Sequence, residues 1–316
     1  MVEPGDLRDC TVRDLPDLLD PADLLVLNDT RVLPSRLVGK RGESTIEVTL
    51  HQRVQGDRWR AFARPGRRCR LGDRLVFAPG FFADVLAKGE GGEITLDFAA
   101  CEGSLIDRLE AHGVMPLPPY IKRPRGGDAR DRDDYQTLFA RRAGAVAAPT
   151  AALHFTEQLM AALAQRGIAH GFVTLHVGAG TFLPVKASDT EDHVMHAEWY
   201  DVPAKTVDLV AGTRARGGRV VAVGTTVLRA LESAADATGA LGAGRGETRL
   251  FITPGYRFKV IDRLMTNFHL PRSTLFMLTA AFAGLGRMQA AYAHAIVHGY
   301  RFYSYGDACL LTRDSA

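Results

Sequence analysis

The stretch RVVAVGTTVLRALES, residues 219–233, decides the fold class, because an apolar strand passes through one glycine directly into a helix. The β-branched run VVAV favours a short, fully buried strand. The residues after Gly224 carry apolar side chains at helical spacing, which predicts a helix over 226–236. A buried strand followed at once by a helix is typical of a layered α/β domain.

The same alternation of helix and strand extends along the chain in both directions. A further buried strand is expected at LLVLN (24–28), where the chain opens into the polar loop NDTRV. Thr156 is placed to cap a helix that ends at Gly167. The remaining predicted elements are the strand FVTLHV (172–177), a helix near 203–216, the strand TRLFITPG (248–255), helices over about 273–283 and 287–298, and a last strand near DACLL (307–311).

A block with a different pattern lies between about residues 36 and 100. It consists of short strand-like runs separated by turn signals such as Gly56-Asp57 and Gly72-Asp73. Several short strands at such close spacing predict a small barrel or sandwich. We therefore expect residues 36–100 to be a domain inserted into an α/β domain that comprises residues 1–35 and 101–316.

Composition and the first residues argue against several classes of protein. Of 316 residues, 46% are hydrophobic and 24% are charged, as in ordinary globular proteins. The sequence contains no apolar run of about eighteen residues, and MVEPGDLRDC lacks the basic start and apolar stretch of a signal peptide. We therefore expect no membrane span and a cytoplasmic location. The four cysteines share no short spacing, which argues against a disulfide framework or a cysteine zinc site.

Arginine outnumbers lysine by 33 to 6, although the net charge is only +3. Seven arginines lie between Arg58 and Arg74, and six more with one lysine lie between Lys122 and Arg142. Two explanations stay open. One is codon usage in a GC-rich genome, with solvated arginine faces; the other is recognition of phosphates, which a guanidinium binds better than an ammonium. The second explanation would indicate contact with an RNA backbone.

Four polar loops follow predicted strands, at the ends where open α/β sheets bind their ligands. They are NDTR after LLVL, HVGAGT after FVTL, GTTVLR after VVAV, and NFHLP after the apolar stretch Val260–Met265. The hydroxyls of Thr225 and Thr226 lie at a helix N-terminus, which suits an anionic group. Arg229 and Glu232 follow on the same helix, where they could also form a plain surface ion pair. Any one loop alone is more often structural, but four together predict an active site.

Two other motifs are weaker. VGAGT (177–181) resembles a dinucleotide-binding loop, but Leu183 replaces the third glycine of that pattern. His193 and His196 precede Glu198, and their spacing is a weak signal for a metal site. Histidines in such a pattern more often hydrogen-bond a polar ligand or one another, so we expect no bound metal.

Taken together, these loops closely resemble one family, the S-adenosylmethionine:tRNA ribosyltransferase-isomerases of queuosine biosynthesis (QueA). The match extends from about Cys10 to the end of the chain and consists of long, low-degeneracy strings in the family's order. The strings are NDTRVLPSRL (28–37), MPLPPYIKR (115–123), DYQTLFA (134–140), AAPTAALHF (147–155), TLHVGAGTFLPV (174–185), HVMHAEWY (193–200), VVAVGTTVLRALES (220–233), FITPGYRFKVIDRLMTNFHLPRSTLFML (251–278) and YRFYSYGDACLL (300–311).

The resemblance implies a layered α/β main domain with an inserted small antiparallel β-barrel. Such enzymes move the ribosyl part of S-adenosylmethionine onto 7-aminomethyl-7-deazaguanine, which already occupies the wobble position of a tRNA. The ribose is rearranged to an epoxycyclopentane, giving epoxyqueuosine, and adenine and methionine leave. S-adenosylmethionine is then a consumed co-substrate, no metal is needed, and the expected partner of the monomeric enzyme is the anticodon stem-loop of a tRNA with a GUN anticodon.

This chemistry needs a base that removes the proton beside the sulfonium, an acid that protonates the departing adenine, and a pocket that orients the methionine part. The expected pool of acids and bases is Asp29, His154, His176, Glu232, His269 and Asp307. The residues expected to bind substrate are Asn28, Thr30, Arg31, Thr150, Gly178, Gly180, Thr181, His193, His196, Glu198, Gly224, Thr225, Thr226, Arg229, Asn267 and Tyr305. Among these, Arg31 or Arg229 would hold a carboxylate or phosphate, and Tyr305 would stack on a base or pack against the sulfonium.

Three features depart from the family pattern. Ala152 stands where the family usually has glycine, and a positive φ there would cost about 1 kcal/mol. Cys309 replaces a methionine, a soft apolar exchange in a buried strand. The chain also begins later than is usual in the family, and loss of a strand there would leave a sheet edge open. Two other functions therefore stay open: a paralogue that uses S-adenosylmethionine on another acceptor, and an inactive RNA-binding relative, against which the retained polar loops argue.

Overall fold

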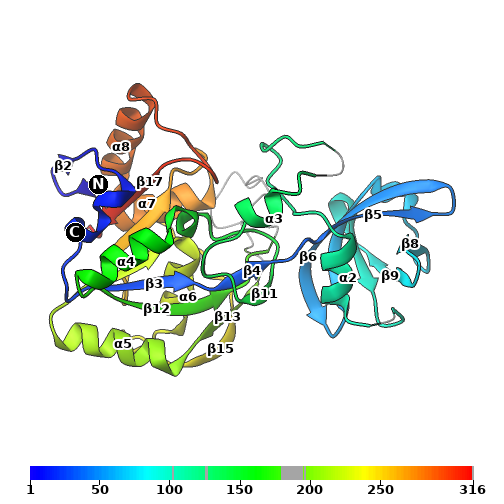
Figure 1. Cartoon of the computed structure of the whole chain (residues 1–316), viewed down its shortest axis with the longest axis horizontal. Helices are drawn as coiled ribbons and strands as arrows, with labels where there is room; N and C mark the ends of the chain where they lie inside the picture. Colours follow the sequence, from blue (N-terminus) through cyan, green and yellow to red (C-terminus); the bar gives the residue numbers. More distant parts are fainter. Residues whose placement is uncertain (102, 125–126, 179–194, 196, 315–316) are drawn as a thin grey trace.

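The structure, a computed structural model, describes residues 1–101, 103–124, 127–178, 195 and 197–314. Figure 1 shows a sheet domain that carries both chain ends and, at the opposite end of the molecule, a smaller barrel. The sheet domain contains a nine-stranded sheet among these residues, and the barrel is closed. The predicted fold class, an α/β domain with an inserted antiparallel β-barrel, is therefore confirmed.

Four parallel strands form the centre of the large sheet, in the order β12, β3, β14 and β16. Their bounds are Ala169–Leu175 for β12, Leu24–Asn28 for β3, Val220–Val223 for β14 and Arg263–Asn267 for β16. On the β12 side the sheet continues through the antiparallel strands β13 (Glu198–Val202) and β15 (Gly244–Thr248). On the other side follow β17 (Ala308–Thr312), β1 (Val2–Glu3) and β2 (Asp6–Leu7).

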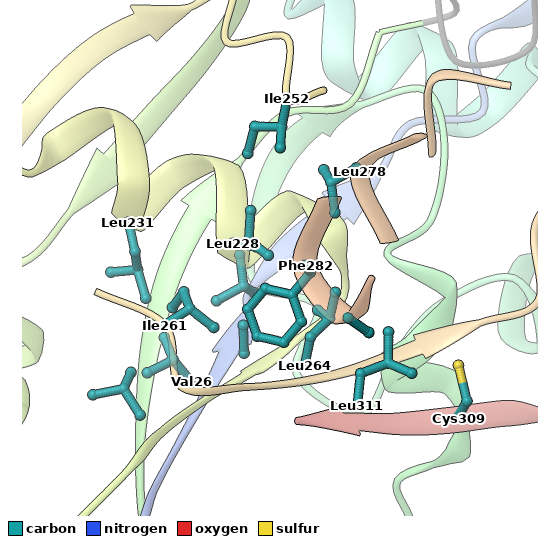
Figure 2. Close-up of a cluster of buried hydrophobic side chains, with 14 of the residues drawn as sticks. Val26, Leu228, Leu231, Ile252, Ile261, Leu264, Leu278, Phe282, Cys309 and Leu311 are labelled. Carbon is teal, nitrogen blue, oxygen red and sulfur yellow. The ribbon is translucent and has the colours of Figure 1, made fainter. Parts of the chain in front are cut away.

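Both faces of this sheet are covered, which explains why its central strands are continuously apolar. Successive residues of a strand point to opposite faces, so Leu24 and Val26 belong to one core and Leu25 and Leu27 to the other. The first core is covered by α5 (Ala204–Ala215), α6 (Thr225–Ala234), α7 (Thr274–Ala283) and α8 (Leu285–Val297), and the second by α1 (Leu15–Leu18) and α4 (Glu157–Gln165). Figure 2 shows α6 and α7 side chains meeting Val26 and its neighbours in the first core.

Local sequence signals explain where these elements begin and end. Thr156 caps α4 as predicted, because its hydroxyl accepts from the backbone N–H of Leu159 at 3.2 Å. The strand predicted at residues 248–255 is wrong: β15 ends at Thr248, and Ile252, which follows it, is buried in the first core. Ala152 lies in a short 3-10 helix without a positive φ, so alanine causes no strain there.

Six antiparallel strands form the barrel, in the order β10, β7, β6, β5, β8 and β9. Their bounds are Arg36–Arg41 for β5, Ser44–Gln55 for β6, Arg58–Arg64 for β7, Arg74–Ala78 for β8, Phe81–Lys88 for β9 and Glu93–Asp97 for β10. Alternate residues point inward and fill the barrel with a separate core that includes Ile46, Trp59 and Phe81. All six strands lie between Arg36 and Asp97, in one continuous stretch of chain.

The barrel joins the sheet domain through a short neck. The chain leaves through β4 (Thr30–Val32) and returns through α2 (Leu105–His112) and α3 (Asp131–Asp134) to β11 (Arg142–Ala145), which pairs in parallel with β4. Leu105 and Leu109 of α2 belong to the barrel core, so α2 closes one side of the barrel. Among the residues described, none of the helices combines the length and apolarity that a bilayer crossing requires.

Candidate active site

The described parts of the four polar loops that were predicted to form a site meet at one edge of the sheet; of HVGAGT, these are residues 176–178. Because β3, β12, β14 and β16 are parallel neighbours, their last residues, Asn28, Leu175, Val223 and Asn267, lie in a row. The antiparallel strands β13 and β17 begin at the same edge. This edge carries the first turn of α6, so backbone donors and polar side chains gather there.

Asn28, the last residue of β3, ties these loops to one another. Its side-chain N–H groups donate to the Leu175 carbonyl at 3.0 Å and to the Thr226 hydroxyl at 3.2 Å. Its Oδ1 accepts from the backbone N–H groups of Thr30 and Leu175, both at 3.1 Å. The hydrogen-bonding capacity of this buried amide is thus used by the protein itself. Asn28 therefore positions the loops and is not placed to bind a substrate directly.

A cavity of 740 Å³ opens at this edge, and we call it the helix-end cavity. Seven of the predicted site residues line it: Thr150, Gly224, Thr225, Thr226, Arg229, Asn267 and His269. Three tyrosines, Tyr120, Tyr135 and Tyr303, line it as well. Small-molecule sites typically have volumes of roughly 300–1,000 Å³, so a nucleoside-sized ligand fits here.

Arg229, on α6, lines this cavity as a buried cation. Its Nη1 donates to Glu198 Oε2 on β13, and its Nε donates to the Leu250 carbonyl at 3.1 Å. The side chains of Arg229 and Glu198 are only 5% and 6% exposed. The Nη2 of Arg229 is also buried but has no hydrogen-bond partner among the described residues. Buried donors are normally paired, so this unused N–H indicates a place for an anionic ligand.

The first turn of α6 adds further donors to the same cavity. Gly224 precedes the helix with a φ of 94°, a left-handed conformation that favours glycine. No described side chain caps this end of α6, so the backbone N–H groups of its first turn are available. The start of α7 differs, because the Ser273 hydroxyl accepts from the N–H of Phe276 at 3.2 Å. The start of α6 is therefore the helix end that can bind an anion.

His269 and Asn267 form another part of the cavity wall. Nε2 of His269 lies 2.9 Å from the Thr266 hydroxyl, and burial lowers the pKa of His269 to about 4. The Asn267 side chain accepts from the Thr150 hydroxyl at 3.1 Å and donates to the Gly306 carbonyl at 3.3 Å. His269 is therefore neutral near pH 7, and Asn267 is held in one orientation from both sides.

A second cavity, of 360 Å³, lies between the barrel and the sheet domain, and we call it the interdomain cavity. The predicted site residues His176, Gly178 and Glu198 line it, together with Trp199 and the barrel residues His51, Arg53, Asp57 and Trp59. Val177 lines both cavities, so they share a wall. The barrel residues were missed from the sequence, because Trp59 stands in an ordinary alternating strand that nothing local marks as functional.

His176 forms the sheet-domain side of the interdomain cavity. Its Nδ1 lies 2.8 Å from the Thr30 hydroxyl, and its ring stacks on Trp199 with 4.9 Å between the ring centres. Burial, reinforced by the charges of Arg142 and Arg53, lowers the pKa of His176 to about 4. The imidazole is therefore neutral near pH 7 and can accept a proton or a hydrogen bond.

Asp29, between Asn28 and Thr30, lies behind this wall. Its carboxylate accepts from the Thr174 hydroxyl at 2.6 Å. Burial raises the pKa of Asp29, although the Thr174 hydrogen bond and the nearby Arg142 act in the opposite direction. A raised carboxyl pKa favours the protonated form that a general acid needs. Asp29 lines neither cavity among the described residues, so it is a neighbour of the site.

Two other predicted residues have structural partners outside the walls of both cavities. The buried Glu232 carboxylate accepts from the backbone N–H groups of Lys259 and Val260, each at 2.9 Å, so it faces a loop beside α6 and not the substrate edge. Arg31 forms an exposed ion pair with Glu110 of α2 at 2.8 Å. Four further predicted residues lie outside the described part of the chain: Gly180, Thr181, His193 and His196.

His154, Asp307 and Tyr305 line neither cavity among the residues described. Burial lowers the pKa of His154, and the negative charge of Asp307 opposes this shift. Asp307 itself accepts from the backbone N–H of Arg301 at 2.7 Å. Tyr305 is 40% exposed and meets Tyr135 edge-on at 6.2 Å between ring centres.

One cluster of potential metal ligands occurs in the described ranges, and it is separate from the two cavities. Asp9, His294 and His298 bring their ligand atoms within 4.8 Å of one another on the surface. Nε2 of His294 already lies 2.8 Å from Asp9 Oδ1, so a hydrogen bond accounts for that contact. The two cavities themselves contain no comparable cluster of ligands from described residues.

Comparison with known proteins identifies relatives over almost the whole chain. Residues 1–311 match the family model described as queuosine biosynthesis protein. A protein of Rhodospirillum rubrum named S-adenosylmethionine:tRNA ribosyltransferase-isomerase is 60% identical over 99% of this chain and 90% of its own length. One of the same name from Rhizorhabdus wittichii is 61% identical over 97% of this chain and 89% of its own length. The crystal structure of S-adenosylmethionine tRNA ribosyltransferase from Thermotoga maritima matches 94% of this chain and 85% of its own, with 35% identity and a TM-score of 0.49.

Proposed function

The chain belongs to the queuosine biosynthesis family, and we propose that its helix-end cavity binds S-adenosylmethionine. The protein is a tRNA-modifying transferase-isomerase. It moves and isomerises the ribosyl part of S-adenosylmethionine onto 7-aminomethyl-7-deazaguanine at the wobble position, giving epoxyqueuosine and releasing adenine and methionine. S-adenosylmethionine is a co-substrate that is consumed in this reaction.

The proposal rests on the buried guanidinium of Arg229, which lines the cavity and has an Nη2 that is unpaired in the described part of the chain. The methionine part of S-adenosylmethionine ends in a carboxylate, and charge-assisted hydrogen bonds from a guanidinium are the strong way to hold one. Arg229, whose buried Nη2 has no partner among the described residues, and the uncapped start of α6 belong to the same cavity wall. Aromatic faces complement the rest of the ligand, because Tyr120 and Tyr303 can pack against adenine or the sulfonium.

Neutral histidines are the proposed proton acceptors. Removing the proton beside the sulfonium needs a group that is unprotonated beforehand, and the lowered pKa values of His269 and His176 keep both rings in that state. His269 lies in the wall of the proposed S-adenosylmethionine cavity, and His176 lies in the wall of the adjoining one. Asp29 stays in the pool because it lies between Asn28 and Thr30 at the edge where the polar loops meet, whereas the Glu232 carboxylate faces a loop beside α6 and leaves the pool.

We propose that the RNA binds the barrel on its arginine face, which we define as Arg60, Arg64, Arg67, Arg68 and Arg70. These five side chains are exposed, and none forms an ion pair with a described residue. The second basic cluster is largely neutralised by carboxylates, through the pairs Arg123–Asp131, Arg130–Asp128, Arg132–Glu110 and Arg142–Asp201. The arginine face therefore offers more uncommitted charge to the phosphates of an anticodon stem-loop.

Several finer properties are proposed from the family resemblance. The tRNA carries a GUN anticodon, and its unpaired anticodon loop exposes the base without melting a helix. The enzyme acts as a monomer in the cytoplasm, where its tRNA substrate is found. No metal takes part, so each proton transfer is made by a side chain or water.

Adenine release from S-adenosylmethionine tests the reaction class. The purified chain is assayed with an anticodon stem-loop that carries 7-aminomethyl-7-deazaguanine at the wobble position, and with the same stem-loop carrying guanine. Release only with the modified stem-loop supports the proposal. Release that requires a different acceptor indicates the paralogue, and RNA binding without any release indicates an inactive relative.

Arg229→Lys tests the cavity assignment. Lysine keeps the charge but loses the forked donors, so we expect the KM for S-adenosylmethionine to rise about tenfold while the KM for the RNA stays unchanged. The control is Arg166→Lys, an exposed arginine of the α4 region that pairs with Asp17. An unchanged KM for S-adenosylmethionine in the folded Arg229→Lys enzyme would refute the assignment.

A further inference from the structure

The interdomain cavity contains both tryptophans of the chain. Trp59 comes from β7 of the barrel and Trp199 from β13 of the sheet domain, so the two domains each contribute one indole. Trp59 is 4% exposed, and its indole N–H has no hydrogen-bond partner among the described residues. Aromatic side chains are the surfaces on which proteins stack unpaired bases.

Carboxylates complete the same cavity. Glu247 on β15 lies directly opposite Trp199 in the strand register, is exposed, and forms no ion pair with the residues that the structure describes. Asp57 lies at the barrel side, with only a loose 3.9 Å contact to Arg53. The neutral state of His176 adds no opposing positive charge at pH 7. Arg53 also lines the cavity and carries one positive charge, so Asp57 and Glu247 together leave the lining with an excess of negative charge. The lining thus favours a flat ligand that is rich in hydrogen-bond donors.

The acceptor base has this chemistry. 7-Aminomethyl-7-deazaguanine presents a ring N–H, an amino group and an aminomethyl ammonium as donors, and its carbonyl oxygen is an acceptor that an indole N–H can meet. A carboxylate can accept from the donor edge or pair with the ammonium. A cavity of 360 Å³ is also at the small end of ligand sites, as expected for a base and not for a whole nucleoside cofactor.

The position of the cavity agrees with the reaction. Its wall shares Val177 with the helix-end cavity, and its Glu198 pairs with Arg229 of that cavity. A base held here would lie beside the proposed site of the ribosyl donor. The cavity is also close to the proposed RNA-binding face. Trp59 lies between Arg58 and Arg60 in β7, and neighbouring residues of a strand point to opposite sides. The strand that contributes an indole to the cavity therefore also contributes an arginine to the proposed RNA-binding face.

We infer that the interdomain cavity receives the wobble base of the tRNA, with Trp59 and Trp199 as its aromatic walls and Asp57 and Glu247 as partners of its donors. This inference rests on the proposed function. It assigns the two substrates to two adjoining cavities, one built within the sheet domain and one completed only by the barrel.

Tryptophan fluorescence tests the inference directly, because every tryptophan of the chain lies in this cavity. The modified stem-loop is titrated into the full chain, and the guanine stem-loop serves as the reference RNA. We expect the modified stem-loop to quench the emission strongly and the guanine stem-loop to bind with weaker quenching. Trp59→Phe and Trp199→Phe each leave a single tryptophan. In each variant we expect the modified stem-loop to quench the emission of the tryptophan that remains.

Variants that remove the negative charge of a cavity carboxylate supply a second test of the inference. Glu247→Gln and Asp57→Asn are each expected to raise the Kd for the modified stem-loop about tenfold, with the KM for S-adenosylmethionine unchanged. Glu43→Gln is the matched control, since Glu43 is an exposed barrel carboxylate outside the cavity wall.

The inference is overturned if the wild-type chain turns over the modified stem-loop while neither tryptophan responds and both variants bind it normally. That outcome leaves the proposed function intact. Absence of adenine release from the wild-type chain is a failure of the proposed function instead. The two failures are therefore distinguishable in one set of assays.

Discussion

Gly144→Ala is expected to disable the enzyme by moving one imidazole. A Cβ built at Gly144 would lie 2.5 Å from Nε2 of His176 and 2.7 Å from its Cδ2, whereas ordinary contacts begin at 3.4 Å. The ring would have to retreat by about 1 Å, but Trp199 is stacked against it and the Thr30 hydroxyl holds Nδ1 at 2.8 Å. A displacement of about 1 Å from productive geometry can lower a catalytic rate about 100-fold. Overpacking of this kind costs about 1–3 kcal/mol of stability, so the variant should still fold.

The assay is the rate of adenine release with saturating S-adenosylmethionine and modified stem-loop, together with thermal unfolding and the NMR resonances of the His176 ring. We expect kcat to fall about 100-fold with a shifted His176 resonance. The control is Gly286→Ala, since a Cβ there meets no atom of the described residues within 4 Å and the residue lies in α8. A normal kcat in an enzyme whose His176 resonance has moved would refute the role of this imidazole. A resonance that has not moved would refute the steric argument.

Three further outcomes are expected. Burial lowers the pKa values of His176 and His269 to about 4, so both rings take up protons more readily in the unfolded chain. The free energy of unfolding should therefore fall as the pH drops from about 6.5 to 4. Urea unfolding at pH 7.5 and at pH 5 should show a smaller fall of this free energy in His269→Asn than in the wild type. Arg60→Ala with Arg64→Ala should reduce the slope of log Kd against log salt by about 2, as measured with the anticodon stem-loop, and an unchanged slope would exclude phosphate contacts. Glu232→Gln should lower the free energy of unfolding by roughly 1–3 kcal/mol, because backbone donors lose their charged acceptor, while kcat of the folded enzyme stays normal; a lost kcat would return Glu232 to the catalytic pool.

Much of the fold follows from patterns that act over a few residues. The passage from β14 through Gly224 into α6, and the cap at Thr156, were predicted because burial, turn conformation and capping are local properties. The strand predicted at 248–255 was wrong for an equally physical reason. Ile252 is buried in the first core together with side chains of α6, and burial alone does not distinguish a strand from an irregular segment in the core.

The sequence predicted the site residues only where the strand order of the sheet brings their loops together. Loops after neighbouring parallel strands must meet, so the polar groups after β3, β12, β14 and β16 could be expected at one edge. Arg229 and Glu232 share one side of α6 by their spacing, so the sequence predicted the same role for both. Their different roles come from distant partners, since Arg229 pairs with Glu198 and Glu232 accepts from the backbone N–H of Lys259. Trp59 and Glu247 were missed because their cavity exists only where the barrel packs beside β13 and β15, a contact between distant parts of the chain.

The insertion of the barrel also sets an order of events during synthesis. The central strand β3 is translated early, but its pairing partners begin only at Ala169 in β12 and Val220 in β14. The barrel strands close a sheet among themselves, and one isolated bridge joins Arg36 of β5 to Val114 beyond the barrel, so the barrel sheet can close as soon as β10 has left the ribosome. A nascent chain halted soon after β10 should therefore hold a protease-resistant barrel behind an apolar segment that still has no sheet to join. For that interval the newborn chain exposes the apolar run LLVL, and exposed apolar segments of incompletely folded chains are prone to aggregate.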